Sequence, residues 1–86
     1  MSQGDKRLAA MRRNAAGDWR IEDVELVCRT FGLDCTAPAR GSHHTVSHPD
    51  KAEILTIPSR RPVKPVYIRM LVAYIDDVRR GQDEQG

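Results

Sequence analysis

Aromatic side chains are scarce in this chain. Its 86 residues include one Trp, one Phe and two Tyr. A surface that binds RNA by stacking bases needs several aromatic rings, so RNA binding here would have to rely on backbone and phosphate contacts. Long apolar runs are also lacking, and the longest stretch without a charged residue is far too short to cross a bilayer. We therefore expect no contact with a membrane.

Cysteine is equally rare. The chain contains only Cys28 and Cys35, and the charged stretch over residues 1–7 is not followed by the apolar region of a secretory signal. Without such a signal, two free thiols are a better expectation than a disulfide bond. The sequence therefore predicts a cytoplasmic protein.

Length and composition are those of one small globular domain with a thin core. Apolar residues make up 40% and charged residues 30% of the chain, which excludes wholesale disorder. The net charge of +2 is uneven: it is zero over residues 1–39, +4 over residues 40–69 and −2 over residues 70–86. The middle third is thus suited to meet a polyanion, although a solvated basic face would have the same composition.

Apolar spacing and turn residues predict five elements after a polar segment. Apolar residues three and four apart indicate a helix over residues 20–31, with Asp18 as N-cap and Gly32 ending it. Three short strands are expected over residues 33–37, 43–48 and 53–57. A final helix is expected to begin at Pro65 and to end at Gly81. Its predicted apolar face comprises Val66, Met70, Leu71, Tyr74, Ile75 and Val78.

The expected fold class is α+β, in the order α-β-β-β-α. Each helix has one apolar stripe, so both helices should pack on the same face of a three-stranded antiparallel sheet and leave the other face open. Residues 1–17 are expected to form an N-terminal arm outside the core, with a short helix over about residues 5–13. Residues 18–80 then form the domain, and residues 81–86 a frayed tail.

All three histidines fall within residues 43–48, in the second predicted strand. Side chains alternate along a strand, so His43 falls on one face while His44 and Val46 fall on the other. Because Val46 is the clear core residue, its face should look toward the helices, which leaves His43 on the open face. A bulge at Gly41 would shift this assignment.

A histidine beside a glycine turn suits RNA cleavage through the ribose 2′-OH. That reaction needs a proton removed from the hydroxyl and another given to the leaving 5′-oxygen, and imidazole, with an unperturbed pKa of about 6.5, can do either. A turn such as Gly41-Ser42 lets backbone N–H groups approach a phosphate. Cations flanking the loop into the last helix could stabilise the phosphate charge; they are Arg60, Arg61, Lys64 and Arg69. A solvated basic face and a structurally neutral histidine would show the same residues.

Zinc binding is an alternative use of these side chains. The ligands would be Cys28, Cys35, His43 and His48, separated by six, seven and four residues. No Cys-x-x-Cys pair is present, and the four side chains fall on different elements that face different ways. We therefore expect no metal and no other cofactor.

In their order and spacing these features resemble the HicA (YcfA-like) family of toxins, which are mRNA interferases. The resemblance runs from about residue 18 to residue 78, which is most of the chain. It is carried by three stretches: Gly41-Ser42-His43-His44, then His48-Pro49-Asp50 with the following strand that ends in Thr56-Ile57-Pro58, and finally residues 62–69.

The resemblance implies a fold like that of double-stranded-RNA-binding domains, used to cleave mRNA without a metal ion. The family's catalytic histidine follows Gly-Ser, which places that role on His43. The family also pairs with an antitoxin of the HicB type that covers the active surface. A non-catalytic RNA-binding module of the same fold and a protein-interaction domain are the alternatives.

Each candidate site residue has an expected role. His43 is the general base or acid, with His44 as a less favoured helper. Ser42 and the backbone of Gly41 are expected to orient the reacting phosphate. The residues expected to hold neighbouring phosphates are Arg40, Arg60 and Lys64.

Overall fold

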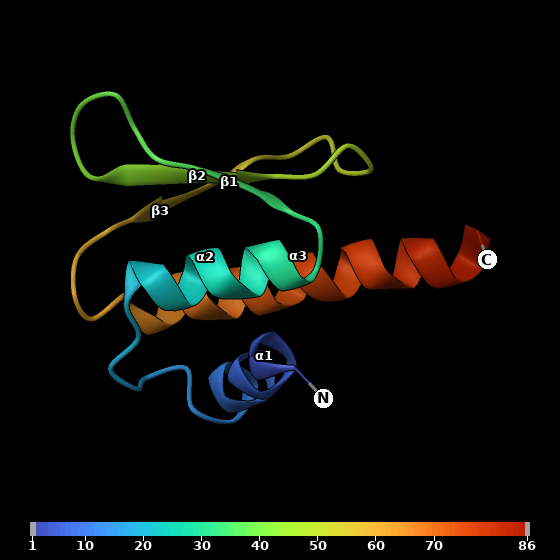
Figure 1. Cartoon of the computed structure of the whole chain (residues 1–86), viewed down its shortest axis with the longest axis horizontal. Coiled ribbons are helices and arrows are strands. Elements are labelled where there is room, and N and C mark those ends of the chain that lie inside the picture. Colours follow the sequence, from blue (N-terminus) through green and yellow to red (C-terminus); the bar gives the residue numbers. More distant parts are fainter. Residues whose placement is uncertain (1, 86) are drawn as a thin grey trace.

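A computed structural model describes residues 2–85, which form three layers (Figure 1). The helices are α1 (Gln3–Arg13), α2 (Ile21–Thr30) and α3 (Pro65–Gln85), and the strands are β1 (Asp34–Thr36), β2 (His43–Ser47) and β3 (Leu55–Pro58). From α2 onward the order is the predicted α-β-β-β-α, and the fold class is α+β as expected. The sheet forms one layer, α2 and α3 lie side by side on one of its faces, and α1 forms a third layer beneath them (Figure 1).

The sheet is an antiparallel meander in the order β1-β2-β3. Its register places Val46 of β2 between Cys35 of β1 and Leu55 of β3. Val46 and Leu55 are buried against the helices, whereas Thr45, one step along β2, is exposed on the open face. The alternation expected for the second strand is therefore confirmed, and the glycine turn does not shift it.

Helix α2 ends as the sequence predicts but begins differently. Gly32 has φ of 76°, a conformation that favours glycine, and the N–H of Leu33 donates to the Cys28 carbonyl at 2.8 Å to close the helix. At the other end, the predicted N-cap Asp18 is wrong. The N-cap residue is Arg20, whose backbone N–H donates a hydrogen bond to Oδ2 of Asp23 in the first turn at 2.9 Å. Asp18 lies outside the helix.

Helix α3 begins at Pro65 as predicted, but its buried stripe is turned relative to the expected one. Val66 is 49% exposed and Met70 is 44% exposed, while Ile68 and Val72 are buried in their place. The reason is that α3 is covered from two sides, by the sheet and α2 and also by α1, so the buried arc shifts toward α1. Gly81 does not end this helix, which continues to Gln85. The predicted frayed tail is thus helical over residues 81–85, and residue 86 lies outside the described residues.

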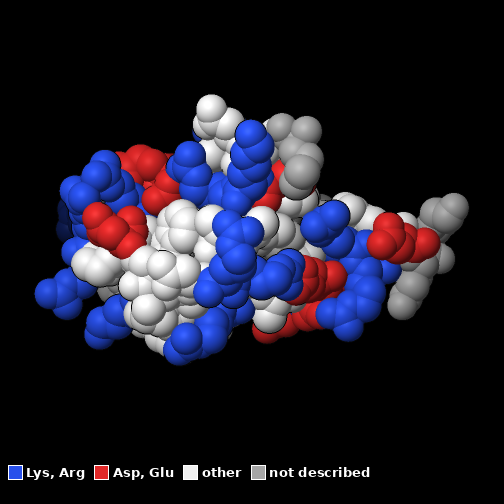
Figure 2. All heavy atoms as spheres, turned by 90° about the horizontal axis from the view of Figure 1, so that it is seen from below, with Lys and Arg blue, Asp and Glu red and all other residues white. Residues whose placement is uncertain are grey.

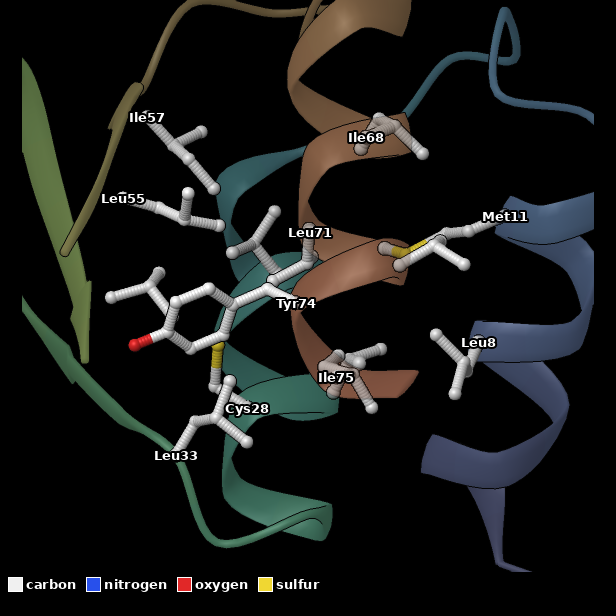
Figure 3. Close-up of a cluster of buried hydrophobic side chains, with 14 of the residues drawn as sticks. Leu8, Met11, Cys28, Leu33, Leu55, Ile57, Ile68, Leu71, Tyr74 and Ile75 are labelled. Atoms are coloured by element: carbon white, nitrogen blue, oxygen red, sulfur yellow. The ribbon is translucent and has the colours of Figure 1, made fainter. Parts of the chain in front are cut away.

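The N-terminal segment belongs to the core, which corrects the expectation of an arm outside it. Leu8 is 3% exposed and Met11 is fully buried. Both side chains point from α1 toward α3, where Ile75 lies close by (Figure 3). The spacing of Leu8 and Met11, three residues apart, predicts the short helix. Its burial could not be predicted, because the apolar surface against which it packs forms only when α2 and α3 pack together.

Close backbone contact and ion pairs hold α1 in place. A Cβ atom at Gly4 would lie 2.5 Å from Cβ of Thr30 on α2, so only glycine permits this approach. Asp76 of α3 accepts two hydrogen bonds at 2.8 Å from the guanidinium of Arg12. This ion pair lowers the pKa of the Asp76 carboxyl. Burial of Leu8 and Met11 nevertheless makes the larger contribution, because exposed ion pairs stabilise by only about 0–1 kcal/mol.

Candidate active site

Three connections meet at one end of the molecule. Residues 14–20 join α1 to α2, residues 37–42 join β1 to β2, and residues 59–64 join β3 to α3, all at the left in Figure 1. Lys and Arg side chains are prominent at this end, with Asp and Glu among them (Figure 2). We call residues 59–64 the basic loop, since they contain Arg60, Arg61 and Lys64.

An open cavity of about 760 Å³ lies at this end, and we call it the His43 cavity. It is bounded by the end of the 37–42 connection, the end of β3, the basic loop and the first turn of α3. The lining residues are Ser42, His43, Pro58, Arg60, Arg61, Pro62, Lys64 and Tyr67. The structure thus brings four predicted site residues, Ser42, His43, Arg60 and Lys64, into one cavity.

His43 is held by the sheet rather than by a loop. It is the first residue of β2, it is exposed, and its register partner is Pro58 at the end of β3. Just beyond this pair, the N–H of Ser59 donates to the Ser42 carbonyl at 2.6 Å. The pairing of β2 with β3 therefore fixes where the histidine stands relative to the basic loop.

Gly41 shapes the approach to His43 without lining the cavity. Its φ of 83° lies in the left-handed region, which glycine adopts without strain, so the chain turns sharply before β2 begins. Arg40 and Gly41 are both exposed in this connection, next to Ser42, but neither is among the lining residues. Arg69, on α3, lines a different and smaller cavity between α1 and α3.

His44 is not brought to the cavity. Its side chain is on the helix-covered face of the sheet, with only 9% of the residue exposed, and its Nδ1 has no hydrogen-bond partner among the described residues. A direct helper role at a phosphate in the His43 cavity is therefore incompatible with its position.

The three cations of the His43 cavity differ in how firmly they are held. Within the described part of the chain, neither Arg60 nor Lys64 forms an ion pair. Arg61 does: its Nη2 and Nε donate to the two carboxylate oxygens of Asp18 at 2.9 and 3.3 Å. These hydrogen bonds lower the pKa of Asp18 and raise the pKa of Arg61. Among the described residues, the cavity therefore combines two cations without an ion-pair partner and one that a carboxylate holds.

Sequence reasoning did not assign Tyr67 to the site, and it named Arg61 only as one of the cations that flank the loop into the last helix. Arg61 belongs to the same basic stretch as Arg60, and nothing in the sequence distinguishes one from the other. Tyr67 lies in the first turn of α3 and is half-buried. From the sequence alone, an aromatic residue in a helix is expected to pack against the core. Both side chains line the cavity because the basic loop and the first turn of α3 lie beside His43.

The zinc alternative is not supported by the geometry of its donors. Among the side chains that the structure describes, no three of His, Cys, Asp or Glu are grouped so that they could hold a metal ion. His43 lies on the open face of the sheet, whereas Cys28 is buried between α2 and the sheet. Cys28 and Cys35 are free thiols, as predicted.

Comparison of the chain with protein-family models, with curated proteins and with solved structures found no match. None of the helices within residues 2–85 has an apolar stretch of the length that a membrane crossing requires. Functional inference therefore depends on the chemistry of the His43 cavity and on the resemblance in sequence described above.

Proposed function

We propose that this protein is an endoribonuclease of the HicA type, which cleaves mRNA by histidine acid/base catalysis in the His43 cavity. The observation that carries the proposal is the placement of one exposed imidazole in an open cavity beside Arg60, Arg61 and Lys64. A phosphodiester needs both kinds of group at once, because protons move while negative charge builds on the phosphoryl oxygens.

The chemistry assigned to His43 is proton transfer at the ribose. The 2′-oxygen forms a bond to the adjacent phosphorus as His43 takes its proton, and the bond from phosphorus to the 5′-oxygen breaks. The leaving oxygen receives a proton from water or from the imidazolium. The products are a 2′,3′-cyclic phosphate and a 5′-hydroxyl, so the atoms and charges balance without a cofactor.

The other residues bind and orient the substrate. Ser42 lies at the rim of the cavity directly before His43, where its hydroxyl and the nearby Gly41 backbone can orient the reacting phosphate. Arg60 and Lys64 hold the charge of that phosphate or of its neighbour. Arg40, exposed in the connection before Ser42, extends this basic surface along the RNA.

The cellular setting of the proposal comes from the resemblance alone. It implies a toxin of a toxin–antitoxin system that acts in the cytoplasm on mRNA, and a cognate antitoxin of the HicB type that covers the His43 cavity. The order α-β-β-β-α with α2 and α3 on one face of the sheet is the arrangement that the resemblance implies, which supports the proposal.

The proposal is tested on the substrate side with two oligonucleotides of one sequence, a single-stranded RNA and the same strand made of DNA. We expect cleavage of the RNA only, with 2′,3′-cyclic phosphate and 5′-hydroxyl ends, because the 2′-OH is the nucleophile. Equal cleavage of the DNA would contradict the mechanism. Binding of RNA with a steep salt dependence and no cleavage would replace the enzyme by a non-catalytic RNA-binding module.

A further inference from the structure

We propose that Arg61 is a phosphate-binding residue of the His43 cavity and that Asp18 is the residue that positions its guanidinium. The inference rests on the proposed ribonuclease function and adds to it a defined role for Arg61 and one new residue, Asp18. It also gives the connection between α1 and α2 a role in the site, although that connection contributes no residue to the cavity lining.

The contact between the two side chains leaves part of the guanidinium available. Asp18 accepts from Nη2 at 2.9 Å and from Nε at 3.3 Å, which occupies one edge of the planar group. Nη1 has no carboxylate partner among the described residues. Because Arg61 also lines the His43 cavity, a guanidinium held along one edge can present the other edge to a phosphate.

The segment around Asp18 is itself anchored to the rest of the molecule. The carbonyl of Trp19 accepts a hydrogen bond from the N–H of Val63 at 2.7 Å, which attaches the residue after the cis Arg61–Pro62 peptide to this segment. The indole N–H of Trp19 donates to the Asn14 carbonyl at 2.8 Å, just after α1 ends. The carboxylate that holds Arg61 thus directly precedes a residue that is anchored both to the basic loop and to the end of α1.

Stability does not explain this ion pair. The side chains of Arg61 and Asp18 are 56% and 60% exposed, and exposed pairs contribute little to folding. The carboxylate also weakens the positive field that would attract RNA, so Asp18 opposes simple electrostatic binding. A guanidinium that is already held next to the reacting phosphate favours the chemical step rather than binding. It can stabilise the negative charge that builds on the phosphoryl oxygens without first having to reorganise.

The experiment measures kcat and KM for a single-stranded RNA with the wild type, Asp18→Asn and Arg61→Lys. Asp18→Asn should lower kcat by about tenfold, since loss of positioning affects the chemical step. Its KM should stay the same or fall, because a negative charge is removed beside the cavity. Arg61→Lys keeps the charge but loses the two-point contact, and we expect a similar fall in kcat.

The chain offers a matched control in Asp76, which accepts two hydrogen bonds from Arg12 far from the cavity. Asp76→Asn removes the same kind of ion pair and should leave kcat and KM within about twofold of the wild type. If Asp18 acts through Arg61, the double variant should be no slower than Arg61→Lys alone. Independent, multiplying losses in the double variant, or an Asp18→Asn enzyme as fast as Asp76→Asn, would overturn the inference.

A binding measurement separates this inference from the proposed function. Arg61→Ala should reduce the slope of log binding constant against log salt by about 0.7 for a single strand, the loss of one phosphate contact, whether or not RNA is cleaved. An unchanged slope would overturn the role of Arg61 even in an active ribonuclease. If the wild type binds RNA without cleaving it, the ribonuclease function and the effect of Asp18 on kcat fail together, whereas the phosphate contact of Arg61 is still decided by the salt slope. If the wild type does not bind RNA, every part fails.

Discussion

His43 and His44 are consecutive residues of β2, yet they lie on opposite faces of the sheet. His43 is exposed in the cavity with the basic loop, whereas His44 is 9% exposed on the face that the helices cover. A single step along a strand therefore separates a residue that can meet substrate from one that belongs to the core.

Substitution of the two histidines should affect different properties. His44→Ala should lower the free energy of unfolding by about 1–3 kcal/mol, because it leaves a cavity between the sheet and the helices. His43→Ala should change it by less than about 0.5 kcal/mol. Urea denaturation of both variants checks this prediction. Equal destabilisation by both would contradict the assignment of the two faces.

Tyr67 contributes a phenol ring to the lining of the His43 cavity. We expect its ring to stack on a base next to the scissile phosphate, so Tyr67→Leu should weaken RNA binding by about 1 kcal/mol or more. The salt dependence of binding should not change, because no charge is removed. Tyr67→Phe is the control and should bind as the wild type does. A weaker salt dependence in Tyr67→Leu would instead indicate a disturbed basic loop.

Helix α1 should prove necessary for stability. Met11→Ala removes a fully buried side chain from the layer between α1 and α3, and it should lower the free energy of unfolding by about 2–5 kcal/mol. Lys6→Ala, at an exposed position of the same helix, should change it by less than about 0.5 kcal/mol. Equal unfolding midpoints for the two variants would show that α1 does not pack as described.

The two thiols should differ in reactivity. A hydrogen bond from Cys28 lowers the pKa of the half-exposed Cys35, while the neighbouring Cys35 and burial raise the pKa of Cys28. At about pH 7, iodoacetamide should therefore modify Cys35 first, because the thiolate is the reacting form. Mass spectrometry of the native protein should show one added group in the wild type and none in Cys35→Ser. Modification of native Cys35→Ser would contradict this order.

Much of the fold could be predicted because local signals agreed with tertiary packing. Gly32 and Pro65 mark helix ends through their own backbone restrictions, which no distant contact has to supply. The alternation of β2 follows from Val46 alone, since one firmly buried residue assigns the whole strand to its faces.

What could not be predicted depends on neighbours distant in the sequence. The apolar spacing predicts Val66 as a core residue, yet it is exposed. Which side of α3 is buried depends on the packing of α1 against it. Asp18 has the composition of an N-cap, and its actual partner, Arg61, is 43 residues away. The inclusion of Tyr67 in the site likewise depends on where the first turn of α3 lies relative to His43, which local sequence does not encode.

The central claim is tested most directly by cleavage of a single-stranded mRNA in the presence of EDTA. Wild type, His43→Ala and Thr45→Ala are compared, since Thr45 is exposed on the same face of β2 but does not line the cavity. We predict that the wild type and Thr45→Ala cleave despite the chelator, and that His43→Ala is slower by at least about a hundredfold. Cleavage by His43→Ala at the wild-type rate, or loss of wild-type activity on chelation, would contradict a metal-independent reaction carried out by His43.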